Sequence, residues 1–218
     1  MGTMGVFKKD GSLNFSATNA QIYTGGICYI NKNVYAVSTI IVGNLYVGIY
    51  KFSSQNRNFR LVKTHSLGGS FLSGHIASDG KDLYVLTRSQ TVPQQADEIR
   101  KVCPKTGTVK FMWSMPNTRY YKGLVHDGYN FYTWQTTNKD VYQIRLRKSS
   151  STAIVNKVFA HGTIYTDMTF DKMFLNFSRN TAVIRTLHRV PLKPCWVVSV
   201  AAALDGVTTN GKDFIGVT

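Results

Sequence analysis

The chain has 218 residues, of which 43% are hydrophobic and 17% are charged, and this composition excludes a disordered polypeptide. Lysine and arginine number 26 against 11 acidic residues, so the net charge of +15 favours contact with an anionic partner or serves solubility alone. Neither a signal-peptide core nor 18 consecutive apolar residues occur, and we expect a soluble protein with no signal peptide and no membrane-spanning segment.

Five segments of the chain share a turn with Asn, Asp or Gly followed by a strand of apolar and aromatic residues. They are NKNVYAVST, DGKDLYVLT, DGYNFYTWQ, FDKMFLNFS and NGKDFIGVT, which begin at residues 31, 79, 127, 170 and 210. A short apolar strand precedes each segment, and two further strands joined by a polar turn follow each of the first four. Four strands in 40 to 48 residues are typical of one propeller blade.

The fifth repeat has only its first two strands, and the start of the chain supplies the other two. VFKKDGSLNF at 6–15 aligns without a gap with VCPKTGTVKF at 102–111, which are the outer strands of the second repeat. We therefore predict an all-β fold, a five-bladed β-propeller of four-stranded antiparallel blades whose N-terminal strands complete the C-terminal blade and close the ring. A five-unit β-sandwich with coincidental similarity between repeats is the alternative.

The predicted propeller is a single domain that covers residues 1–218. Its blades are expected at about 26–69, 70–118, 119–162, 163–202, and 203–218 joined with 1–25.

Acidic residues give two competing interpretations. Asp79, Asp127 and Asn210 each precede a glycine, so they either form hairpin turns or line a ring that binds calcium; we predict turns, because Asp-Gly and Asn-Gly favour tight hairpins. A glycosidase would need converging carboxylates, and Glu98, Asp167 and Asp205 are the only candidates. Because no catalytic motif is present, we predict no catalytic residues, no cofactor and a protein that is not an enzyme.

Histidines and cysteines do not occur at metal-ligand spacing. His75 and His126 take nearly equivalent positions in neighbouring repeats, where they either line a wet channel or assemble a metal site across blades. We predict no metal site. The three cysteines include no C-x-x-C pair, which indicates buried free thiols rather than a disulfide scaffold.

The connections between repeats lie on the propeller face that usually binds partners, and they supply the predicted binding residues. Aromatic rings beside cations suit a sugar, a nucleobase or a protein partner, or else the rings pack between blades. The candidates are Arg119, Tyr120, Tyr121, Lys122, His161, Tyr165 and Phe71.

The positive charge falls mainly on the predicted outer strands, where it forms a basic rim. This rim either meets an acidic neighbour or discourages edge-to-edge aggregation. Its members include Arg100, Lys101, Arg145, Arg147 and Lys148.

The repeat units and the split fifth blade resemble compact five-bladed propellers, namely tachylectin-type lectins and the propeller domains of virus spikes and tail nozzles. The resemblance implies a non-enzymatic interaction or assembly protein that binds other subunits, such as a tail nozzle, spike or attachment protein in the virion; a cytoplasmic location is the alternative. A glycan-binding lectin and a basic protein that binds nucleic acid are the alternative functions. An acidic glycan or a nucleic acid would then be the partner.

Overall fold

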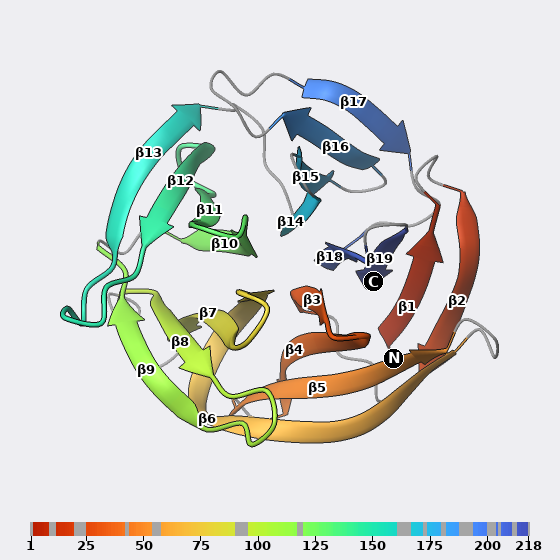
Figure 1. Ribbon diagram of the computed structural model, residues 1–218, viewed down its shortest axis with the longest axis horizontal. Helices are drawn as coiled ribbons and strands as arrows, with labels where there is room; N and C mark the ends of the chain where they lie inside the picture. Colours follow the sequence, from red (N-terminus) through yellow and green to blue (C-terminus); the bar gives the residue numbers. More distant parts are fainter. Residues whose placement is uncertain are drawn as a thin grey trace.

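The computed structural model describes residues 2–8, 12–19, 25–41, 44–53, 58–89, 96–116, 120–160, 167–171, 174–179, 182–187, 194–199, 204, 206–210 and 213–217. The described elements are all strands, and they are arranged around a central axis (Figure 1). In chain order these are β1 (Gly2–Phe7), β2 (Leu13–Asn19), β3 (Ile27–Ile30), β4 (Asn33–Ile41), β5 (Asn44–Ser53), β6 (Asn58–Ser78), β7 (Leu83–Ser89), β8 (Glu98–Val102), β9 (Val109–Ser114), β10 (Tyr121–His126), β11 (Phe131–Gln135), β12 (Asp140–Arg145), β13 (Ile154–Ala160), β14 (Asp167–Asp171), β15 (Phe174–Arg179), β16 (Ala182–Leu187), β17 (Pro194–Ser199), β18 (Gly206–Thr209) and β19 (Phe214–Val217).

Every strand pairs antiparallel with its neighbours, which confirms the predicted all-β propeller of four-stranded antiparallel blades. Three of the described sheets have four strands, in the orders β10-β11-β12-β13, β14-β15-β16-β17 and β18-β19-β1-β2. The last sheet joins the two ends of the sequence, because β1 pairs with β19 in the register Met4 to Val217 through Phe7 to Phe214. Strand β2 then pairs with the other edge of β1.

The remaining sheet differs from the prediction of five separate sheets. It has seven strands in the order β3 to β9, so the described strands form four sheets rather than five. Strand β6 is the cause: it has 21 residues, and its first part pairs with β5 while its second part, from Phe71, pairs with β7. The sequence predicts a break near residue 70, but the backbone continues as one strand from the outer edge of one four-strand group to the inner edge of the next.

The innermost strands pack around the central axis. Contacts run from β3 to the second part of β6, then to β10, β14, β18 and back to β3 (Figure 1). The core lies between neighbouring groups of strands rather than inside one layer. One cluster, for example, joins Leu86 and Trp113 to Leu124 and Tyr142 of the next sheet. Full burial of side chains of this size contributes about 1.5–3 kcal/mol each.

Asp79, Asp127 and Asn210 form turns, as the sequence predicts. Oδ1 of Asp79 accepts hydrogen bonds from the backbone N–H groups of Lys81 (2.9 Å) and Asp82 (2.7 Å). Gly80 has a φ of 87°, a backbone conformation that residues with a side chain rarely adopt. Asp127 accepts the same pair of bonds one sheet further along, and Asn210 accepts one from Asp213.

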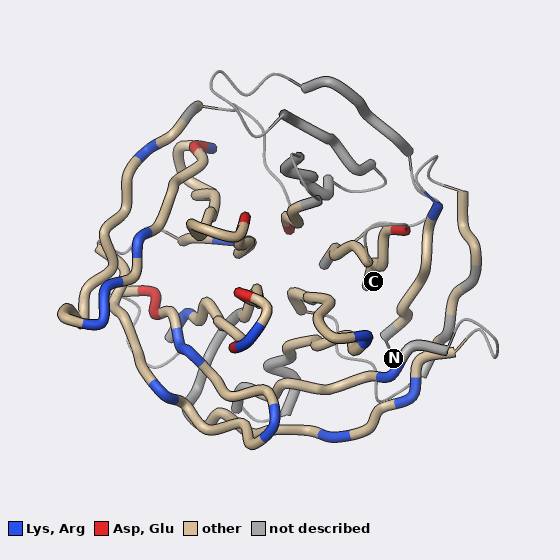
Figure 2. The backbone as a smooth tube through the Cα atoms, viewed as in Figure 1, with Lys and Arg blue, Asp and Glu red and all other residues tan. Residues whose placement is uncertain are grey.

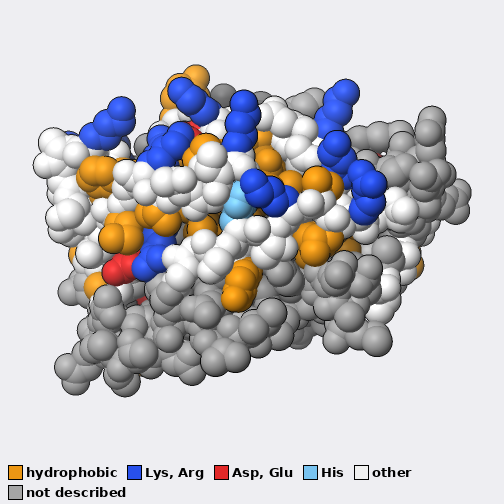
Figure 3. Space-filling view, turned by 90° about the horizontal axis from the view of Figure 1, so that it is seen from below, with side chains coloured by type: hydrophobic (Ala, Val, Ile, Leu, Met, Phe, Trp, Pro, Cys, Tyr) orange, Lys and Arg blue, Asp and Glu red, His pale blue; other side chains and the backbone are white. Residues whose placement is uncertain are grey.

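The cationic side chains have an uneven distribution. Lys and Arg lie mainly along the outer strands of the described sheets, whereas several acidic residues lie at the inner turns (Figure 2). Seen from the side, the Lys and Arg side chains gather along one edge of the outer surface (Figure 3). Among the described residues, no helix has the length and apolar character to cross a membrane.

Candidate ligand-binding site

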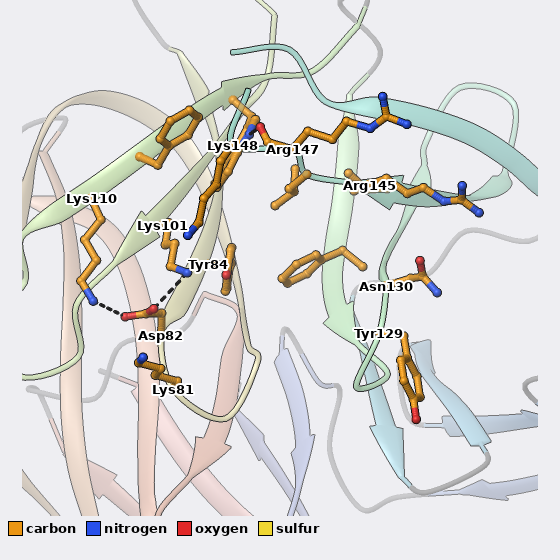
Figure 4. Close-up of a pocket in the computed structure, with 15 residues that line it drawn as sticks. Lys81, Asp82, Tyr84, Lys101, Lys110, Tyr129, Asn130, Arg145, Arg147 and Lys148 are labelled. Atoms are coloured by element: carbon orange, nitrogen blue, oxygen red, sulfur yellow. Dashed lines mark hydrogen bonds and ion pairs between the residues drawn. The ribbon is translucent and has the colours of Figure 1, made fainter. Parts of the chain in front are cut away.

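A pocket of about 690 Å³ lies between the β7–β9 strands and the β10–β13 sheet. Its volume is within the range of small-molecule sites. The lining is basic and aromatic: six side chains are lysine or arginine, and Asp82 is the single carboxylate among them. Figure 4 shows the lining residues, which come from both groups of strands.

One end of the pocket, here called the Asp82 end, is formed by Lys81, Asp82, Lys101 and Lys110. The β6–β7 turn places Asp82 where β8 and β9 bring two ammonium groups to it. Nζ of Lys110 lies 2.6 Å from Oδ1 of Asp82, and Nζ of Lys101 lies 3.0 Å from Oδ2 (Figure 4). The Asp82 side chain is only 4% exposed, while that of Lys110 is 43% exposed. One buried carboxylate therefore holds two cations at the pocket wall.

Asp82 and Lys101 stabilise each other's charged form. Burial alone would raise the pKa of Asp82, but the hydrogen bonds and charges of Lys110 and Lys101 lower it overall. Partial burial alone would lower the pKa of Lys101, yet its bonds to Tyr84 and Asp82 and their charges raise it. Neither group is poised to exchange protons near neutral pH, so the arrangement suits ion binding rather than acid–base catalysis.

Aromatic rings form the wall behind the charges. Tyr84, Trp113 and Phe131 are 6% exposed or less. The ring centroids of Tyr84 and Phe131 are 4.4 Å apart, and Phe111 lies 4.4 Å from Trp113. Nζ of Lys101 lies 5.2 Å from the centroid of the Tyr84 ring. A ligand with a ring or another apolar body would contact this wall.

The opposite side of the pocket, here called the arginine end, is formed by Arg145 and Arg147. Arg145 ends β12 and Arg147 follows it in the turn to β13. Figure 4 shows both side chains extending away from the Asp82 end. The indole Nε1–H of Trp113 donates a 2.9 Å hydrogen bond to the carbonyl of Arg147. This bond ties β9 to the turn between β12 and β13 across the pocket.

Four of the five predicted rim residues lie at this pocket, namely Lys101, Arg145, Arg147 and Lys148. Arg100 lies elsewhere, where it donates to the Leu67 carbonyl and pairs with Glu98. Sequence reasoning missed Lys81, Asp82 and Lys110. The alternation of basic and apolar residues along 144–148 was a usable signal, but the neighbour that completes the pocket comes from another repeat.

The predicted loop residues stay a prediction, because three of the seven lie outside the described part of the chain. Arg119, His161 and Tyr165 belong to undescribed segments, and the side chain of Phe71 is also undescribed. Among the others, Lys122 is exposed. Tyr120 is 44% exposed, with the Arg88 guanidinium 3.6 Å above its ring. Tyr121 is buried at 4% exposure and packs edge-on against Tyr142, so its ring fills the core between sheets.

Two buried acids, Asp97 and Asp167, join neighbouring sheets through hydrogen bonds. Oδ2 of Asp97 accepts a 2.9 Å bond from the Tyr121 N–H, and Oδ2 of Asp167 accepts a 3.0 Å bond from the Val207 N–H. Nδ1 of His75 lies 3.5 Å from Oδ1 of Asp167. The channel cavity measures about 90 Å³, the space of roughly three waters.

The other candidate acids and histidines have the following surroundings. Glu98 pairs with Arg100 rather than with another carboxylate, and Asp205 lies outside the described residues. The His126 ring packs on Phe131, and burial lowers its pKa. Within the described part of the chain, no group of three His, Cys, Asp or Glu side chains could hold a metal ion.

Comparison by sequence finds no matching family model and no matching curated protein. Comparison of structures finds propellers. Glutaminyl cyclase from Myxococcus xanthus matches with a TM-score of 0.62 and 10% identity, over 99% of this chain and 93% of that one. A proposed gluconolactonase matches at 0.53 and 11% identity, over 98% and 92%. A proposed 6-phosphogluconolactonase from Bacteroides uniformis matches at 0.50 and 12% identity, over 91% and 67%.

These comparisons correct the functional prediction. The three matched propellers are named as enzymes, and none is named as a virion component, a lectin or a nucleic-acid-binding protein. The predicted non-enzymatic assembly role in a virion is therefore wrong, while binding of a glycan or a nucleic acid stays a prediction. The names also count against the prediction that the protein is not an enzyme. At 10–12% identity, what the chain shares with them is the propeller fold.

Proposed function

We propose that this propeller binds a small organic anion in the pocket between β7–β9 and β10–β13. The observation that carries the proposal is the lining itself: six cationic side chains and one carboxylate surround about 690 Å³ beside a wall of aromatic rings. Phosphate, sulfate and carboxylate groups suit the cations, and a ring or apolar body suits the wall. A small-molecule ligand also agrees with the enzyme names of the matched propellers.

The blade count belongs to the same proposal. We propose that the seven-stranded sheet acts as two blades that share β6, which gives five blades in one domain over residues 1–218. The support is the change of partner along β6, from β5 before residue 70 to β7 after it. The ligand pocket then lies between two neighbouring blades, a common position for small-molecule sites.

Phenyl phosphate is the probe that tests the function, because it combines one anion with one ring. Isothermal titration calorimetry should show saturable binding of phenyl phosphate, weaker binding of inorganic phosphate and no binding of phenol. Binding should also raise the melting temperature in proportion to ligand saturation. Equal binding of phenol and phenyl phosphate would contradict an anion site.

Two variants place the binding at the pocket. Lys110→Met combined with Arg147→Met removes one cation from each end and should weaken phenyl phosphate binding about tenfold or more, as loss of charged hydrogen bonds does. Lys51→Met is the matched control, because Lys51 is an exposed lysine on β5 outside the pocket. If the control loses as much affinity as the double variant, the binding is a general effect of net charge.

Because both the raised pKa of Lys101 and the lowered pKa of Asp82 lie away from neutrality, the charges of this pair should not change there. The affinity for phenyl sulfate, whose own charge is constant, should therefore vary less than about twofold between pH 6 and pH 9. A steep change in this range would assign the binding to a titrating group elsewhere.

A further inference from the structure

We infer that the pocket selects an organic anion with two anionic groups, one at each end of a ring or apolar body. This inference rests on the proposed function and goes further, because it specifies the shape of the ligand. The basis is that the lining cations come from two different sheets, with three lysines around Asp82 on one and Arg145, Arg147 and Lys148 on the other, while aromatic and aliphatic side chains line the same pocket (Figure 4).

The charges at each end favour one anion there. At the Asp82 end, three lysines and one carboxylate line the pocket, so the cations outnumber the acid there. The β10–β13 sheet adds three more cations, Arg145 and Arg147 at the arginine end and Lys148 next to them in the chain, and it contributes no acid to the lining. A ligand with a single anionic group neutralises positive charge at one end only. At the other end the cationic side chains continue to repel one another.

Buried aromatic and aliphatic side chains line the pocket between its two ends. Between the two ends the lining includes Tyr84, Phe131 and Ile144, of which none is more than 6% exposed. The phenol of Tyr84 donates a 2.8 Å bond to Oδ2 of Asp79, which turns its polar atom toward the turn and leaves the ring for the pocket. The body that links the two anions should therefore be a ring or a short apolar chain.

The two ends are held at a fixed separation before any ligand binds. The bond from Trp113 to the Arg147 carbonyl is one constraint. Ser114 adds two others: its N–H donates to the Ser151 carbonyl (2.8 Å), and its carbonyl accepts from the Ala153 N–H (2.9 Å). The turn that carries Arg147 is thus attached to the end of β9. A rigid separation lets a ligand of matching length bind both ends without ordering the chain.

Lys110 is the cation at the Asp82 end that a ligand can recruit most easily. Its side chain is 43% exposed, whereas that of Lys101 is 21% exposed, and Lys101 alone still pairs Asp82 when Lys110 turns to the ligand. Arg147 is its counterpart at the other end, since its backbone is fixed while its side chain is exposed. These two residues are therefore the ones to substitute.

The test compares phenyl phosphate with 1,4-phenylene bisphosphate by calorimetry on the intact chain. Two anions on one rigid body should raise the affinity by about tenfold or more over phenyl phosphate, because the second contact becomes intramolecular. The dependence of affinity on salt should also be steeper for the bisphosphate. Phenyl phosphate supplied at the same total concentration of phosphate groups as the bisphosphate should not reproduce the gain.

Variants separate two-ended binding from a stronger version of one-ended binding. Lys110→Met alone, or Arg147→Met alone, should reduce bisphosphate affinity to near the phenyl phosphate level. Each should change phenyl phosphate affinity by less than about threefold, because that ligand can use the other end. Lys51→Met should leave both affinities unchanged.

The outcomes divide clearly between this inference and the proposed function. Binding of phenyl phosphate with no gain for the bisphosphate would overturn the two-ended ligand and leave the anion pocket standing. So would a single variant that weakens both probes equally. If neither probe binds, the proposed function is wrong, and the inference falls with it.

Discussion

Two cysteines of this chain illustrate how one residue type takes opposite properties from its surroundings. Cys28 is buried, and burial together with the charge of Asp167 raises the pKa of its thiol. Cys103 lies in the β8–β9 turn, where the Thr106 hydroxyl and the backbone N–H groups of Thr106 and Lys105 lower its pKa to about 7. The prediction of buried thiols thus holds for Cys28 and is wrong for Cys103, while Cys195 lies outside the described residues.

Cys103 should be the more reactive thiol. Its alkylation by iodoacetamide is expected to rise as the pH passes through about 7 and to level off above, because the thiolate is the nucleophile. Cys28 should react only when the protein unfolds. Mass spectrometry of peptides after short exposures at pH 6, 7 and 8 measures both rates; equal labelling of the two sites in folded protein would contradict this.

Removing the charge of Asp97 and removing its hydrogen bond should have different effects on the free energy of unfolding. Burial raises its pKa, although the Tyr121 N–H and the charges of Arg88 and His75 oppose this. A raised carboxyl pKa means that folding stability falls as the pH rises from the unfolded value, near 4, through the folded one. Asp97→Asn keeps an acceptor, so it should be at least as stable as the natural chain at pH 7, and this advantage should shrink at lower pH.

Asp97→Ala is the companion variant. It leaves the buried Tyr121 N–H without its acceptor and should reduce the free energy of unfolding by about 1–3 kcal/mol. Urea denaturation at pH 7 and at pH 4.5 measures both variants. Equal losses for Asn and Ala at both pH values would show that the carboxylate charge itself is required.

At the scale of the element, strand type and pairing could be read from the sequence, and the continuity of β6 could not. The alternation in segments such as DVYQIRLRK predicts strands because one face is buried and the other is solvated. The step from one blade to the next depends on whether SLGGSFLSG breaks the strand, and its adjacent pair Gly68 and Gly69 predicts a break. Gly68 does take a φ of 65°, yet pairing resumes with another partner. Tertiary pairing therefore overrides the local signal.

The sheet that joins β1 to β19 depends on close packing at a glycine. A Cβ atom on Gly216 would lie 2.5 Å from Cδ2 of Leu204, which is buried. Gly216→Ala should therefore reduce the free energy of unfolding by about 1–3 kcal/mol through overpacking. Val62→Ala, at a side chain 48% exposed, serves as control and should change it by less than about 0.5 kcal/mol. An unchanged melting temperature for Gly216→Ala would mean that Leu204 moves freely.

The candidate pocket was only half visible to sequence reasoning, and the reason lies at the scale of the whole molecule. Arg145 and Arg147 stand in one repeat, whereas Asp82 and Lys110 stand in the repeat before it. Their approach depends on the angle between neighbouring groups of strands and on the bond from Trp113 to the Arg147 carbonyl. No short sequence pattern encodes that angle. Net charge pointed to an anionic partner, but its placement needed the structure.

The pairing of β1 with β19 allows a prediction about the stability of circular permutants. Because Met4 lies opposite Val217, a short linker can join the two ends of this chain. A circular permutant that starts at Gly25 would then have β18, β19, β1 and β2 contiguous in sequence, and no strand pairing would unite its new termini. We expect it to fold with a lower melting temperature, since closure then rests on side-chain contacts alone.

A second permutant, opened in the exposed turn between Lys105 and Thr106, is the matched control. It places the new ends on neighbouring paired strands, β8 and β9, as the natural chain does with β1 and β19. It should keep a melting temperature closer to the natural one. The opposite ranking, measured by circular dichroism, would contradict a stabilising role for the paired ends.

Strand β6 gives two groups of strands a common backbone, and this has a consequence for local opening. Between Asn58 and Ser78 its backbone pairs first with β5 of the β3–β5 group and then with β7 of the β7–β9 group. Fraying that begins at the outer strands of one group should therefore spread into the inner strands of the next, rather than stop at a flexible connection. In native-state hydrogen exchange, these two groups should open as one cooperative unit, while β10–β13 exchanges with its own free energy.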